Sequence, residues 1–213
     1  MMRLDKELIN LYRETSWLQR AHVILRYLLC PFSAVEKFIP REGKILDLGC
    51  GHGIFANVLA MKSSSRYVIG VDKDSGRIAV ANSTLSGKKN LEFRQLDILG
   101  YSLDSDVNCA VLIDLPLETN QGLLTKLYAK LPSKGILVIK SMSSRRPGWK
   151  HCLNILHMAT VDKLLRVSLR KNAYFLKEED FVLLLEEIGF RVKFLNIDKG
   201  YPCPHCLYIC NKD

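Results

Sequence analysis

The sequence has no apolar run of the roughly 18 residues that a helix needs to cross a bilayer. Its first residues alternate charged with apolar side chains, so a secretion signal with a hydrophobic core is missing as well. Internal repeats and low-complexity tracts are also absent. These absences predict a cytoplasmic protein, and they leave peripheral contact with a membrane surface open.

Acidic residues are scarce beside basic ones, with 22 Asp and Glu against 31 Lys and Arg and a formal net charge of +9. An excess of positive charge favours anionic partners and carries no information about the fold. Hydrophobic residues make up 48% and charged residues 25%, which excludes a disordered or fibrous chain. A length of 213 residues predicts one domain that needs no disulfide or metal to fold.

The seven cysteines are scattered and contain a single C-x-x-C pair, Cys203 and Cys206. A structural zinc site takes four ligands, usually from two such pairs. His205 and Cys210 would complete the number, but a strand there would point Cys206 and Cys210 to one face of a sheet and not to one centre. We therefore expect reduced thiols and no metal site.

Short apolar runs alternate with longer amphipathic ones. Strands are expected at 44–48, 67–71, 91–94, 108–114 and 135–140, and helices between them at 54–61, 75–85 and 119–131. Helices at 150–171 and 177–188 follow, and then closely spaced runs at 190–197 and 206–210 predict a hairpin. This order indicates an α/β doubly wound three-layer sandwich, whose mostly parallel sheet of seven strands has an antiparallel seventh strand.

Three glycines follow the first expected strand, Gly49, Gly51 and Gly53. Three acids stand at the ends of successive expected strands, Asp47, Asp72 and Asp97. Glycines at such a turn let the backbone approach a ligand closely. An acid beside the turn would repel the pyrophosphate of a dinucleotide, whereas S-adenosylmethionine carries a sulfonium and an ammonium group. The charges therefore favour S-adenosylmethionine as the cofactor.

These motifs, from about residue 43 to residue 210, resemble the class I S-adenosylmethionine-dependent methyltransferases. The first motif of that family matches residues 47–53, its fourth-strand motif 111–114, and its turn and fifth strand 131–139. The resemblance implies that Asp72 binds the ribose and Asp97 the adenine. The implied cofactor-binding residues are Asp47, Gly49, Cys50, Gly51, Gly53, Asp72, Lys73, Asp97, Ile98, Ile113 and Asp114.

The resemblance divides the chain into an N-terminal helical cover, residues 1–42, and a methyltransferase domain, residues 43–213. In the cover we expect one helix over 5–30 and a second that begins with a capping box of Ser33 and Glu36. A basic insert, residues 143–172, lies within the domain. It is expected either to pack as a solvated lid helix or to contact an anionic membrane, a carrier protein or phosphate.

Methyl transfer from a sulfonium is a direct displacement, and a hydroxyl acceptor also calls for a base. His205 begins the last expected strand, at the edge where the parallel strands end, and is our candidate catalytic base, with a surface histidine as the alternative. His52 is expected to pack beside the cofactor. Lys140, Arg145 and Arg146 are expected to bind the substrate.

The predicted function is methylation of a small or lipid-like acceptor, through oxygen, with the acceptor free, carrier-bound or at a membrane. Two alternatives stay open. Ribose methyltransferases of RNA use a Lys-Asp-Lys-Glu set, of which Asp114 and Lys140 match two members while His205 replaces the acid. A non-catalytic, cofactor-binding regulatory protein is the other. Methylation of base amines is disfavoured, because residues 114–117 lack an aromatic ring to stack a flipped base.

Overall fold

The computed structural model describes residues 5–99, 106–115, 120–143 and 177–213. Its strands are β1 (Gly43–Leu48), β2 (Arg66–Asp72), β3 (Leu91–Gln95), β4 (Val107–Ile113), β5 (Ile136–Met142), β6 (Arg191–Asn196) and β7 (His205–Asn211). They form one seven-stranded sheet in the order β3-β2-β1-β4-β5-β7-β6. Only β7 pairs antiparallel, with β5 and β6. The predicted doubly wound sheet with an antiparallel last strand is confirmed.

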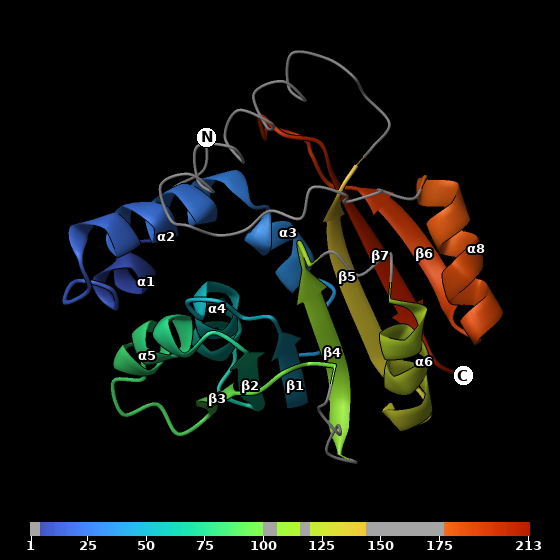
Figure 1. The fold of residues 1–213 in the computed structure, drawn as a ribbon, viewed down its shortest axis with the longest axis horizontal. Helices are drawn as coiled ribbons and strands as arrows, with labels where there is room; N and C mark the ends of the chain where they lie inside the picture. Colours follow the sequence, from blue (N-terminus) through green and yellow to red (C-terminus); the bar gives the residue numbers. More distant parts are fainter. Residues whose placement is uncertain (1–4, 100–105, 116–119, 144–176) are drawn as a thin grey trace.

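Helices cover both faces of the sheet (Figure 1). The helices are α1 (Lys6–Asn10), α2 (Trp17–Leu29), α3 (Phe32–Glu36), α4 (Ile54–Lys62), α5 (Ser75–Ser83), α6 (Gln121–Lys130) and α8 (Glu178–Ile188). One hydrophobic core lies between the sheet and α1–α5, and a second between the sheet and α6 and α8. None of the helices in the described part of the chain combines the length and hydropathy that crossing a bilayer requires.

The predicted single helix over 5–30 is wrong, because the chain leaves the helix after α1 and starts α2 at Trp17. Ser16 causes the restart: its hydroxyl accepts from Gln19 N at 3.3 Å, and Gln19 Oε1 accepts from Ser16 N at 3.1 Å. The capping box expected at Ser33 is also wrong, since α3 follows Pro31 and has no side-chain cap. The predicted helix over 150–171 lies outside the described residues.

Arg66 ties the N-terminal helices to the sheet. Its side chain is fully buried at the start of β2, where its Nη1 lies 2.8 Å from Glu36 Oε1. Its Nε donates to Pro40 O at 2.6 Å and its Nη2 to Ile39 O at 2.9 Å. The Arg66 guanidinium therefore neutralises the charge of Glu36, the last residue of α3. It also donates hydrogen bonds to the carbonyl groups of the segment that leads into β1.

We expect Arg66→Met to lower the free energy of unfolding by about 3 kcal/mol, because Glu36 would keep a buried charge without its partner. Arg41→Ala is the matched control: Arg41 pairs with the same Glu36 Oε1 at 3.6 Å, but its side chain is 71% exposed. The control should cost no more than about 0.5 kcal/mol. Urea denaturation measures both variants, and equal losses would contradict the buried anchor.

Candidate cofactor and acceptor site

Four polar side chains of the strands point to one face of the sheet. Alternate residues of a strand share a face. Residues of that parity in β1, β2, β5 and β7 lie in the core under α1–α5: Ile45, Val68, Val138 and Leu207. The polar residues with the same parity, at the carboxyl ends of the parallel strands and the start of β7, are Asp47, Asp72, Lys140 and His205. All four are buried.

The glycine loop, residues 49–53, joins β1 to α4 through three left-handed residues, with φ of +73° at Gly49, +55° at Gly51 and +77° at Gly53. A Cβ on Gly49 would stand 2.5 Å from Leu115 Cδ1, and one on Gly53 would stand 2.5 Å from Phe93 Cζ. A Cβ on Gly51 would meet nothing within 4 Å. Two glycines therefore allow close packing, and the third borders open space where a ligand can reach the backbone.

Asp72 holds the glycine loop in place. Its Oδ2 accepts from Gly51 N at 2.9 Å, and its Oδ1 accepts from Asp74 N at 2.9 Å. The cap of α5 is Asp74, whose side chain accepts from Arg77 N, so Asp72 is not a helix cap. Each oxygen of Asp72 keeps a lone pair with which it can accept a further hydrogen bond from a ligand hydroxyl.

Asp47 is a buried carboxylate whose Oδ2 has no hydrogen-bond partner among the described residues. Burial, reinforced by the charge of Asp72 and opposed by a hydrogen bond from the Ala56 backbone, raises the pKa of Asp47 to about 7. A buried carboxylate oxygen without a partner is costly unless a cation or donor meets it. Asp47 therefore fits the ammonium group of an amino acid.

The other predicted cofactor residues lie around this centre. Asp97 is exposed, and its Oδ1 accepts from Leu99 N at 3.0 Å. Leu96 N donates to Asp72 O at 3.0 Å, which places the end of β3 beside the end of β2. Three further positions complete the set: Lys73 is exposed, Ile98 is partly buried and Ile113 is buried. The cofactor contacts of these residues stay predictions.

Cys50 lies behind the glycine loop. It is partly buried and packs against the core under α1–α5. A Cβ on Gly70 of β2 would stand 3.1 Å from its sulfur. The thiol therefore faces the sheet, and the predicted cofactor contact of Cys50 would have to come from its backbone.

Asp114 follows β4 in a left-handed conformation, with φ of +53°. Its Oδ1 lies 2.5 Å from Lys140 Nζ, and its Oδ2 lies 2.7 Å from Arg26 Nη2. Burial alone would raise the pKa of Asp114, but the two cations outweigh it and hold the value at about 2. Asp114 is therefore ionised at neutral pH and has a cation at each oxygen.

His205 is only 4% exposed, so the surface-histidine alternative is wrong. Its Nε2 lies 2.9 Å from Leu29 O, and a carbonyl can only accept, so Nε2 carries the proton. Its Nδ1 is buried with no hydrogen-bond partner among the described residues. Burial, helped by the charge of Lys140, lowers the pKa of His205 to about 4, so the ring is neutral and Nδ1 offers a lone pair.

The N-terminal segment, α2 and the turn before it, supplies contacts that the sequence analysis did not find. Tyr12 is buried and donates to His52 O at 2.9 Å, and the rings of His22 and His52 lie 5.2 Å apart. Arg26, four residues after His22, reaches Asp114. The spacing of His22 and Arg26 predicts a shared helix face, but which face packs on the loop is decided by tertiary structure. The predicted substrate residues Arg145 and Arg146 lie outside the described residues.

The donor set fits S-adenosylmethionine. Asp47 would receive the ammonium group, Asp72 the ribose hydroxyls, and the open side of Gly51 the body of the ligand. S-adenosylmethionine has no phosphate group, and the buried acids Asp47 and Asp72 would repel the phosphates of a dinucleotide. Among the described residues, no group of three or more His, Cys, Asp or Glu could hold a metal ion.

Comparison with known proteins agrees with a site for S-adenosylmethionine. A methyltransferase-domain family model matches residues 40–179. A carboxy-S-adenosyl-L-methionine synthase of Nautilia profundicola is 30% identical over 110 residues, 49% of this chain and 47% of that protein. An uncharacterised protein of Methanocaldococcus jannaschii is 31% identical over 126 residues, 53% of this chain and 49% of its own length. The chain thus spans about half the length of these curated relatives.

Solved structures share the fold. A methyltransferase from Aquifex aeolicus superposes with a TM-score of 0.64 at 18% identity, covering 99% of this chain and 100% of that one. Magnesium protoporphyrin IX methyltransferase from Synechocystis, solved with S-adenosylhomocysteine bound, has a TM-score of 0.65 at 15% identity, covering 97% and 93%. The family match confirms the predicted cofactor class. The chain belongs to the S-adenosylmethionine-dependent methyltransferases, the family predicted from its motifs.

Proposed function

We propose that the protein transfers a methyl group from S-adenosylmethionine to an oxygen of a small or lipid-like acceptor. The observation that carries the proposal is the Nδ1 of His205: a buried, unprotonated acceptor at the edge of the sheet where the cofactor site opens. A hydroxyl group of the acceptor suits this nitrogen, because the hydroxyl can donate a hydrogen bond to Nδ1 and then transfer its proton to it.

The reaction requires little of the protein beyond position and a proton acceptor. When bound, S-adenosylmethionine supplies a methyl group on a positively charged sulfur. The acceptor oxygen forms a bond to that carbon while the carbon–sulfur bond breaks, and His205 Nδ1 takes the hydroxyl proton. A pKa of about 4 suffices for this role because the hydroxyl becomes strongly acidic as its oxygen is alkylated. Asp114, ionised nearby, stabilises the imidazolium that results.

The acceptor class is tested by incubating the protein with methyl-labelled S-adenosylmethionine and separate lipid, small-molecule, RNA and protein fractions. Label in the lipid or small-molecule fraction, in base-stable, ether-type linkage, supports the proposal. Label confined to protein or to a nitrogen atom would contradict it.

His205→Ala should lower kcat on the labelled acceptor by about 100-fold, the usual contribution of a general base. The affinity for S-adenosylhomocysteine should change less than about twofold, because His205 is on β7, which β4 and β5 separate from β1 and its glycine loop. Cys206→Ala is the matched control, since Cys206 is the next residue of β7, equally buried, and packs in the other core. Unchanged kcat in His205→Ala would remove the proposed base.

Ribose methylation of RNA is a second candidate, favoured by one observation. The Lys-Asp-Lys-Glu set lacked a first basic member in the sequence, and Arg26 stands against Asp114 beside Lys140 in the structure. Label in RNA that is stable to base and binding that weakens steeply with salt would support this candidate over the first.

A further inference from the structure

The amino-acid end of S-adenosylmethionine carries a carboxylate as well as an ammonium group, and the acids of the cofactor site cannot hold a carboxylate. A carboxylate needs hydrogen-bond donors, which a cationic side chain near Asp47 can supply together with backbone N–H groups. Among the described residues, the charges of Lys140, Arg77 and Arg26 act on the glycine loop or on the acids beside it. Lys140 is fully buried and paired with Asp114 at 2.5 Å. Arg77 lies on α5, where its Nε is 3.9 Å from Asp74 Oδ2, and its charge also acts on Cys50 and His52 of the glycine loop.

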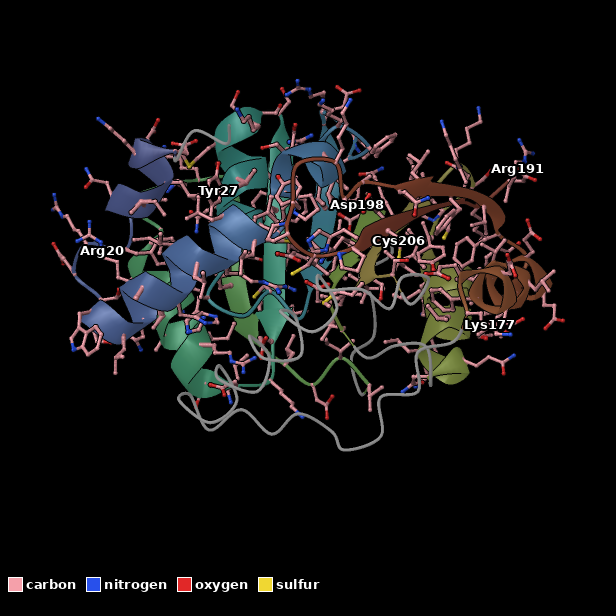
Figure 2. All side chains as sticks on the ribbon, turned by 90° about the horizontal axis from the view of Figure 1, so that it is seen from above. Arg20, Tyr27, Lys177, Arg191, Asp198 and Cys206 are labelled. Atoms are coloured by element: carbon pink, nitrogen blue, oxygen red, sulfur yellow. The ribbon has the colours of Figure 1, made fainter. Side chains whose placement is uncertain are left out.

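Arg26 lies in the last turn of α2. One turn earlier on the same face of α2, the ring of His22 lies 5.2 Å from the ring of His52 in the loop. Arg26 itself contacts Asp114 at 2.7 Å, and the next residue, Leu115, packs directly on Gly49. This face of α2 therefore contacts the glycine loop at His22 and the end of β4, the strand beside β1, at Arg26 (Figure 2 shows α2 from above).

Arg26 also has the capacity for a second anion. A guanidinium has five donors in a planar fork, and contact with one carboxylate leaves others available. The Arg26 side chain is 36% exposed, whereas that of Lys140 is fully buried. Asp47 and Arg26 interact electrostatically: Arg26 acts to lower the pKa of Asp47, and Asp47 acts to raise the pKa of Arg26. An acid and a base so placed match the two charges of an amino acid.

We infer that Arg26 binds the carboxylate of the cofactor, while Asp47 receives its ammonium group. The inference rests on the proposed function only in taking S-adenosylmethionine as the ligand. It makes α2 a part of the cofactor site and not merely a cover over it. Methionine-type ligands would then be recognised by a pair of opposite charges, one from the sheet and one from the N-terminal helices.

Two ligands separate this role from a structural one. S-adenosylhomocysteine has the amino-acid end, and 5′-methylthioadenosine has the same nucleoside and thioether without it. In calorimetric titrations, Arg26→Gln should lower the affinity for S-adenosylhomocysteine by about 10- to 100-fold, the range for a lost charge-assisted hydrogen bond. The same variant should bind 5′-methylthioadenosine within twofold of the wild type, which also shows that it is folded. Arg26→Lys should recover part of the loss.

Arg77→Gln is the matched control and should leave the ratio of the two affinities unchanged. A ratio that falls in Arg77→Gln and not in Arg26→Gln would overturn the inference by assigning the carboxylate to Arg77. An equal loss of both ligands in Arg26→Gln would overturn it as well, because Arg26 would then act only through Asp114. A wild-type protein that binds neither ligand would instead refute the proposed function, and the two failures are therefore distinguishable.

Discussion

Asp47→Asn should weaken S-adenosylhomocysteine binding by about 100-fold, since the ligand's ammonium group would enter a buried site without an opposite charge. The amide keeps the size of the carboxylate, so the loss reports charge and not packing. Melting temperature should not fall, because the carboxylate of the free protein is buried without a partner at Oδ2. Calorimetric titration of the two proteins at one pH measures the difference.

The same residue predicts a pH dependence. Its pKa of about 7 in the folded protein exceeds the ordinary 3.8, so below about pH 7 most of the free protein holds a proton on Asp47 that a bound ammonium group would displace. Affinity for S-adenosylhomocysteine should therefore rise from about pH 6 to about pH 8 as the carboxylate ionises. Fold stability should move the other way, falling between about pH 4 and about pH 7, because only the folded state binds this proton there. Asp47→Asn should show neither trend, and a variant that keeps both would contradict the role of Asp47.

Asp72→Ala should reduce S-adenosylhomocysteine affinity by more than about 100-fold, because two effects combine. The variant removes the expected acceptor for the ribose hydroxyls. It also leaves Gly51 N and Asp74 N without their acceptor, and the glycine loop would lose the contact that fixes its open residue. The affinity of 5′-methylthioadenosine should fall as much, since that ligand has the same ribose.

Asp74→Ala separates the loop contact from simple helix capping. Asp74 caps α5 through Arg77 N at 2.9 Å, and its loss should cost about 1 kcal/mol of stability. Its affinity for either ligand should stay within about threefold of the wild type. If Asp74→Ala lost binding as severely as Asp72→Ala, the effect of Asp72→Ala would be explained by damage to the start of α5. The proposed contact of Asp72 with the glycine loop and the ligand would then be contradicted.

The positions of Asp47, Asp72 and Lys140 were predictable because each follows an apolar run at the carboxyl end of an expected parallel strand, and such ends meet at one edge of the sheet. That these three side chains share one face depends on the register between the strands, which the structure supplies. His205 was predictable in position but not in burial. Its Nε2 is held by Leu29 O at the end of α2, a contact between residues far apart in the sequence.

Arg26 and Tyr12 could not be found in the same way. Arg26 belongs to α2 and Tyr12 to the turn between α1 and α2, and no local sequence pattern states which part of the domain an amphipathic helical cover packs on. The break between α1 and α2 was missed for a different reason. Apolar periodicity runs through residues 5–30, and the capping box of Ser16 and Gln19 overrides it.

The central claim is that a site lined by buried acids beside the glycine loop accepts a nucleoside with a zwitterionic amino-acid tail. Calorimetric titration of the wild-type protein with S-adenosylhomocysteine and, separately, with NAD tests it most directly. S-adenosylhomocysteine should bind with one-to-one stoichiometry, and NAD should give no binding heat because its pyrophosphate would face Asp47 and Asp72. Binding of NAD without binding of S-adenosylhomocysteine would contradict the claim.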